Sequence, residues 1–139
     1  SSYIWIQCNH FRREDLSFML AIAKIPFLGM SFTGVLCTLS IKGKTRIFTT
    51  YTGASIQFFK DEPESLLITI RQGKELIHVK VDKKEGSVLK APNKGAMLRE
   101  IGEALGSTME LNIFYDHQLR VCEKGINVGF ERVGKLEEL

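Results

Sequence analysis

The sequence predicts an all-β protein, folded as an antiparallel β-barrel with one α-helix near residues 93–105. Two observations support this prediction. Short runs of alternating apolar and polar residues recur at a spacing of about 8–12 residues, and such alternation is typical of half-buried strands. Turn residues separate these runs. A sheet of about ten strands tends to curl and close, because closure leaves no strand edge unpaired.

The chain has 139 residues, which is enough for one domain with its own hydrophobic core. We expect a barrel domain over residues 1–133 and a charged tail over residues 134–139. Hydrophobic residues make up 44% of the chain and charged residues 25%, which excludes disordered and fibrous proteins. The net charge of the chain is only +3, and its Lys and Arg residues are scattered along the sequence. No nucleic-acid partner is therefore expected.

The expected strands are runs bounded by turn residues. They cover residues 3–11, 16–25, 31–41, 45–51, 54–59, 66–71, 76–81, 87–90, 109–115, 119–124 and 126–130. Gly43 and Gly73 lie where the chain reverses tightly, and glycine adopts the positive φ that short hairpins need. Within one run, Ile77, Val79 and Val81 alternate with polar residues, which predicts that these three face the core.

One segment departs from this alternation. After Pro92, the residues Met97, Ile101 and Leu105 recur every four positions, which is the stripe of an amphipathic helix. Gly106 follows this stripe, in the position where a glycine commonly ends a helix. The spacing therefore predicts the single helix, ahead of the last three strands.

The three cysteines, Cys8, Cys37 and Cys122, are odd in number and widely spaced. Without a Cys-x-x-Cys pair they predict neither a zinc site nor a redox motif, so we expect free thiols and a reducing, cytoplasmic location. The sequence has no apolar run near the ~20 residues that span a bilayer. Ser1 leads almost directly into the first expected strand, so we expect the chain to be part of a longer protein or a processed product.

The first strand is the most unusual segment. Alternation places Trp5, Gln7 and Asn9 on one face, while the residues between them form an apolar face that we expect to belong to the core. An indole beside two amides suits the wall of a pocket, where the ring covers an apolar ligand and the amides hold its polar end. We therefore expect these three residues to point into the barrel and bind the ligand. The alternative is a structural role in which the amides bond to nearby backbone.

The other candidates for chemistry are dispersed. His10, His78 and His117 lie on separate elements without metal-ligand spacing, so we expect no metal site. Glu110 and Glu131 fall within strands. Either could donate a proton if it faced the barrel interior, although a position facing solvent is the simpler interpretation. No nucleophile or phosphate-loop motif is present, and no cofactor is expected.

Two motifs give the chain a family resemblance. The segment Trp5–Asn9, Trp-Ile-Gln-Cys-Asn, resembles a strand of the tocopherol cyclases. The segment Leu89–Asn93, Leu-Lys-Ala-Pro-Asn, looks like that family's Leu-Arg-Ala-Pro-Thr ahead of its late helix. The order of features between and after them also matches, as far as the closing strand Gly125–Glu131. The resemblance therefore extends over nearly the whole chain.

This resemblance implies a lipocalin-like barrel that forms the C-terminal half of a longer protein, beside an N-terminal domain. Tocopherol cyclases also look distantly similar to hydroxyneurosporene synthases. The plant enzymes protonate a prenyl double bond, and a phenolic hydroxyl traps the resulting cation without a redox cofactor. An aromatic ring such as Trp5 could stabilise that cation. This chain has a single Trp where plant members have many, and it resembles bacterial cyclase-like proteins.

Three functions follow as hypotheses. The first is a cyclase or hydratase that acts on a prenylated substrate. The second is a non-catalytic module that binds an isoprenoid or another lipid, with a peripheral membrane contact as a further option. The third is a structural barrel, filled by its own Phe side chains, that supports the N-terminal domain. An interior cavity of about 300 Å³ or more would favour the first two.

Overall fold

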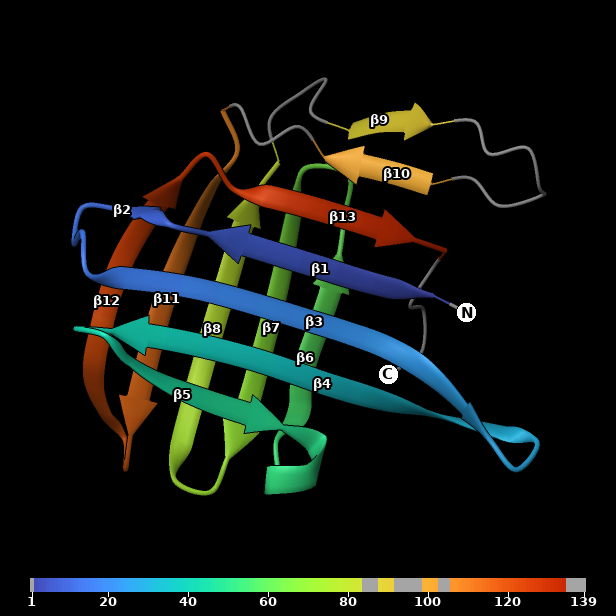
Figure 1. Cartoon of the computed structure of the whole chain (residues 1–139), viewed down its shortest axis with the longest axis horizontal. Coiled ribbons are helices and arrows are strands. Elements are labelled where there is room, and N and C mark those ends of the chain that lie inside the picture. Colours follow the sequence, from blue (N-terminus) through green and yellow to red (C-terminus); the bar gives the residue numbers. More distant parts are fainter. Residues whose placement is uncertain (1, 84–87, 92–98, 103–105, 135–139) are drawn as a thin grey trace.

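A computed structural model describes residues 2–83, 88–91, 99–102 and 106–134 of the chain. These residues form two antiparallel sheets that pack face to face, with the strands of one sheet running across those of the other (Figure 1). The prediction of an all-β fold is confirmed. Neither sheet closes into a barrel within the described ranges, so the closed barrel stays a prediction.

The seven-stranded sheet has the strand order β5-β4-β3-β1-β13-β10-β9. Its strands are β1 (Tyr3–Cys8), β3 (Leu16–Phe27), β4 (Met30–Ile41), β5 (Lys44–Thr49), β9 (Val88–Ala91), β10 (Arg99–Gly102) and β13 (Gly129–Val133). The six-stranded sheet has the order β2-β12-β11-β8-β7-β6. Its strands are β2 (His10–Phe11), β6 (Ser55–Asp61), β7 (Ser65–Gln72), β8 (Glu75–Asp82), β11 (Thr108–Tyr115) and β12 (Gln118–Ile126).

The core lies between the sheets and is built mainly by alternation of buried and more exposed residues along the strands. In β8, Ile77, Val79 and Val81 are buried, as the sequence predicts. Large buried side chains from both sheets meet in one cluster, which includes Ile4, Ile6, Phe18, Leu20, Ile22, Phe48, Leu66, Ile68, Ile70, Met109, Leu111 and Phe130. Burial of apolar area contributes about 25 cal/mol per Å² and is the main force that holds the sheets together.

The N-terminal segment joins the two sheets. The expected single strand over residues 3–11 is interrupted at Asn9, so β1 pairs with β3 and β13 while β2 pairs with β12. A strand that changes sheets makes a corner of an orthogonal sandwich. The β5–β6 connection makes another corner through a short 3-10 helix, η1 (Thr50–Thr52), which ends at Gly53 with φ of +94°.

Two strand boundaries differ from the sequence prediction. Strands β3 and β4 extend to a two-residue turn at Leu28 and Gly29, which both have positive φ, so the hairpin is longer than expected. The last turn lies at Asn127, with φ of +54°, rather than at Gly125, which stays inside β12. In both places the side-chain packing and pairing of the sheet override the local signal from Pro or Gly.

The predicted helix over residues 93–105 is wrong where the structure describes that range. Arg99–Gly102 forms β10, which pairs with β9 and β13. The rest of the range lies outside the described residues. A spacing of four residues is a multiple of two, so the sequence pattern of Met97, Ile101 and Leu105 fits one face of a strand as well as one face of a helix. The tail over residues 134–139 is described only at Gly134.

Candidate functional site

The structure reverses the direction in which the predicted site residues face. Ile4, Ile6 and Cys8 are buried in the core between the sheets, while Trp5 and Gln7 are half-buried on the opposite side of β1. Their shared face is confirmed, but the inward orientation is wrong. Asn9 is exposed at the break between β1 and β2 and is not part of the β1 face that carries Trp5 and Gln7. The more apolar face of β1 enters the core because its burial removes more apolar surface from water.

Trp5 therefore lies on the outer face of the seven-stranded sheet, the face turned away from the six-stranded sheet. Its partners across the strands are Ala21 on β3 and Glu131 on β13. A Cβ atom added at Gly129 would lie 3.4 Å from Cζ3 of the indole, so the ring rests against the bare backbone of that glycine. Aromatic rings cover strand glycines in this way and fix the register between strands.

Glu131 brings a carboxylate to this face. It is half-buried, and the hydroxyl of Tyr3 donates a hydrogen bond to its Oε1 atom. Because the register places Glu131 directly across from Trp5, an acidic group lies beside an aromatic face. Glu110, the other strand acid, lies on the six-stranded sheet, where its Oε1 is 3.7 Å from Nζ of Lys124.

An apolar groove continues this face beyond Trp5, with a volume of about 270 Å³. It is lined by Ala21, Ala23, Ile25, Phe32, Gly34, Val35, Leu36, Thr49, Thr50 and Tyr51. The groove exists because small residues occupy outward positions on two adjacent strands: Ala23 pairs with Gly34, and Ala21 pairs with Leu36. Since Ala21 also pairs with Trp5, the groove and the indole are neighbours on one sheet face.

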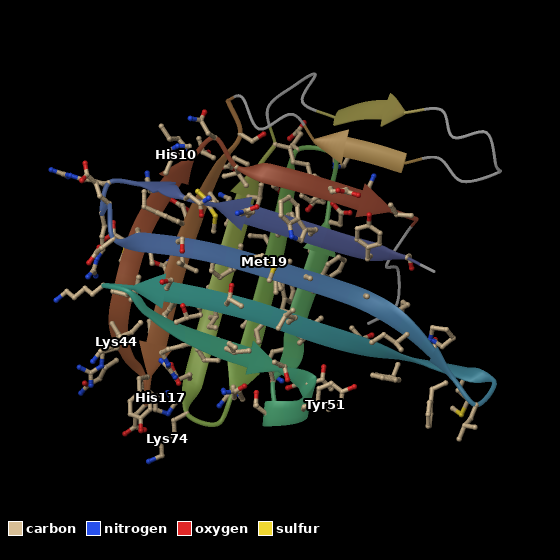
Figure 2. All side chains as sticks on the ribbon, viewed as in Figure 1. His10, Met19, Lys44, Tyr51, Lys74 and His117 are labelled. Atoms are coloured by element: carbon tan, nitrogen blue, oxygen red, sulfur yellow. The ribbon has the colours of Figure 1, made fainter. Side chains whose placement is uncertain are left out.

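The rim of the groove is held by local hydrogen bonds. The Oγ1 atom of Thr50 accepts a bond of 2.8 Å from the backbone nitrogen of Val35, which ties η1 to β4. Thr49 and Thr52 cap η1 reciprocally. Tyr51, which is almost fully exposed, therefore projects from a fixed turn at the groove edge. Figure 2 shows this side of the molecule, with Met19 on β3 and Tyr51 after β5 labelled.

The β3–β4 hairpin extends past the rest of the sheet (Figure 1). Its tip carries large, exposed apolar residues. Phe27 is 63% exposed, Leu28 86% and Met30 77%. Ile25 and Phe32, which line the groove, lie on the same hairpin nearer its base. Contiguous exposed apolar residues are uncommon on soluble monomers and mark places of interaction.

The remaining candidates do not converge on this face. His10, His78 and His117 lie on different elements, and His78 is held by Thr69, whose Oγ1 is 2.9 Å from Nδ1. Among the described residues, no three His, Cys, Asp or Glu side chains gather in a way that could hold a metal ion. Within the same described residues, no helix is long and apolar enough to cross a membrane.

The three cysteines are free thiols, as the sequence predicts. Cys8 and Cys37 are buried, and Cys122 is exposed on β12. Burial raises the pKa of the Cys37 thiol to about 12 and also raises the pKa of Cys8. Because the thiolate is the reactive form, these two buried cysteines are inert packing residues.

Comparisons of the chain with family models, with curated proteins and with solved structures found no match in any of the three. The site therefore rests on its own geometry. The sequence pattern pointed to Trp5, Gln7 and Glu131 but not to the groove beside them. A signal was present: Ala21, Ala23 and Gly34 are small residues at outward positions, where their size leaves a hollow between larger neighbours.

Proposed function

We propose that this chain is a binding domain for an apolar small molecule of the isoprenoid or lipid class, held on the outer face of the seven-stranded sheet. The apolar groove beside Trp5 is the observation that carries this proposal. Its volume of about 270 Å³ is close to the lower bound of about 300 Å³ for ligand pockets, which suits a thin hydrocarbon chain. Apolar side chains from β3 and β4 form most of its lining.

The polar end of the ligand would lie toward β1 and β13. Trp5 separates the groove from Glu131, and Tyr3 and Gln7 flank Trp5 on the same face of β1. A hydroxyl or phenol on the ligand could bond to this carboxylate or to the amide of Gln7. The resemblance to tocopherol cyclases, whose motif contains Trp5 and Gln7, supports a prenylated ligand and a lipocalin-like origin for the two sheets.

The exposed hairpin tip supports a peripheral membrane contact as part of the same proposal. Phe27, Leu28 and Met30 are the kinds of side chain that enter the boundary between lipid head groups and acyl chains. No charged residue occurs between Lys24 and Lys42, so the whole hairpin tip is uncharged. A groove that opens along this hairpin could receive an apolar ligand directly from a lipid surface.

Filling the groove tests the proposal. We expect Ala21→Leu to weaken the binding of farnesol, a simple isoprenoid alcohol, by at least about tenfold, because the new side chain occupies the space that the ligand needs. Trp5 is the only Trp in the chain, so its fluorescence reports on this face alone. Farnesol should shift the Trp5 emission in the wild-type protein, and equilibrium dialysis gives the affinity independently.

Ser17→Leu is the matched control, because Ser17 lies on the same outer face of β3 but does not line the groove. It should bind farnesol as the wild type does. Equal affinity of Ala21→Leu and the wild type would contradict the proposed site. If the wild type binds no farnesol, the structural alternative gains support, in which another part of a longer chain covers this face.

Cyclase activity is a second candidate, favoured by the position of Glu131 across from Trp5. The Glu131 carboxyl would protonate a prenyl double bond, the indole would stabilise the tertiary cation, and the phenolic oxygen would add to it. Loss of the phenolic proton to the carboxylate then restores the acid. Trp5 and Tyr3 would position the substrate and the carboxyl group respectively.

Glu131→Gln should lower the rate of chromanol formation from a prenylated hydroquinone by about a hundredfold or more, the usual contribution of a general acid. The product can be measured by chromatography. Glu110→Gln removes a strand carboxyl from the other sheet and should leave the rate unchanged. A wild-type protein that binds the hydroquinone but forms no chromanol would exclude cyclase activity and leave the binding function.

A further inference from the structure

Two hairpin turns lie side by side at one end of the six-stranded sheet. Gly73 and Lys74 connect β7 to β8, and Asp116 and His117 connect β11 to β12. The strands β8 and β11 are neighbours, and the backbone nitrogen of Asp116 donates a 2.9 Å bond to the carbonyl oxygen of Lys74. Figure 2 shows Lys74 and His117 close together at this end. The two turns are therefore held in a fixed relative position.

A hollow of about 320 Å³ lies against these turns, on the outer side of the six-stranded sheet. Leu76, His78 and Phe114 supply apolar and aromatic surface to it. The His78 ring is fixed from two directions: Thr69 bonds to its Nδ1 at 2.9 Å, and the ring meets Phe114 edge to face at 5.4 Å. One part of the hollow is thus a rigid, largely apolar floor.

The rim of the hollow is basic. Arg71, Lys74 and His117 line it together with a single acid, Asp116. Within the described residues, no carboxylate oxygen lies within 4 Å of the charged nitrogens of Arg71 or Lys74, whereas several other basic side chains there are paired. The adjacent Glu75 is engaged by Arg46, with Nη1 2.6 Å from Oε2.

We propose that this hollow binds a phosphate monoester whose attached group is flat and apolar. Arg71 and Lys74 would hold the phosphate, because two cations match its nearly double negative charge and Arg bonds phosphate oxygens in pairs. A ring N–H of His117 would donate a further hydrogen bond to the phosphate. The apolar group would lie on Leu76 and Phe114. This site is separate from the groove on the other sheet and does not depend on the function proposed for it.

Phenyl phosphate is the probe, and its two halves, inorganic phosphate and phenol, are the comparison ligands. In an NMR titration we expect phenyl phosphate to shift the amides of both turns and to bind at least about tenfold more tightly than either half. Arg71→Gln and Lys74→Gln should each weaken it by about tenfold, as expected for the loss of a charge-assisted hydrogen bond. Phe114→Ala should reduce the affinity for phenyl phosphate and leave that for inorganic phosphate unchanged.

Lys60→Gln is the control, since it removes the same charge from an exposed position on β6 outside the hollow. It should bind phenyl phosphate as the wild type does. Inorganic phosphate that binds as tightly as phenyl phosphate would overturn the role of the apolar floor. Benzoate that binds as tightly would overturn the preference for phosphate. Equal weakening by Lys60→Gln would show only non-specific attraction to a basic surface.

Discussion

Replacing Phe18 by alanine is expected to lower the free energy of unfolding by about 3–5 kcal/mol, which is the usual cost of removing a large aromatic side chain from a core. Phe18 is 1% exposed and is one of the two largest fully buried side chains. Phe18 lies on β3. Its cross-strand partners are Cys8 on β1 and Leu39 on β4, and both are buried. The variant loses the transfer energy of the ring and leaves a cavity that these neighbours fill only in part.

Urea unfolding monitored by circular dichroism measures this change, provided that the transition stays two-state. Met19→Ala is the matched control. Met19 is the next residue on β3 but lies on the outer face and is only half-buried, so its truncation should cost about 1 kcal/mol or less. Equal losses in the two variants would contradict the assignment of the inner and outer faces of β3.

Gly125→Ala should cost about 3 kcal/mol, at the upper end of the usual range for added methyl groups in a packed core. Strand propensity alone predicts the opposite sign, because glycine is a poor strand residue. The close contacts around Gly125 outweigh this propensity. An added Cβ would lie 2.4 Å from Sγ of Cys8, 2.9 Å from Cε1 of Phe11 and 3.2 Å from Cγ of Met109. These three side chains are buried and cannot all withdraw.

Gly129→Ala is the comparison, because its added Cβ meets nothing closer than 3.4 Å and its backbone is not in the left-handed region. We expect its free energy of unfolding to change by less than about 0.5 kcal/mol. Cys8→Ala should recover part of the loss in the double variant with Gly125→Ala, since it removes the closest atom. An unchanged midpoint for Gly125→Ala would contradict the close contact between β12 and the β1–β2 corner.

The sequence allowed the strands to be predicted because their alternation is local. Ile77, Val79 and Val81 face the core as expected, since each polar neighbour gains more from water than from the core. Strand β10, which lies where a helix was expected, was not predictable in the same way. The spacing of Met97, Ile101 and Leu105 fits both a helix and a strand. The pairing of β10 with β9 and β13 depends on the strand order of the sheet, which a local sequence pattern does not reveal.

The candidate site was predictable only in part. Alternation placed Trp5 and Gln7 on one face of β1 and an apolar core face opposite them, but it could not show that the Trp5 face points away from the second sheet. The direction in which each face of β1 points depends on where the other strands place their apolar side chains. Ile4 and Ile6 belong to a core cluster with apolar residues from both sheets. The pairing of Trp5 with Ala21 and Glu131 comes from strand order, which joins residues far apart in the sequence.

We propose that the ligand lies on the outer face of the seven-stranded sheet rather than between the sheets. Strand β1 reports on both places, because Trp5 faces outward while Ile4 and Ile6 face the core. Intermolecular NOEs from bound farnesol measure the location directly. We expect contacts to the Trp5 indole and to the methyl groups of Ala21 and Ala23. Contacts confined to the methyl groups of Ile4 and Ile6 would contradict it.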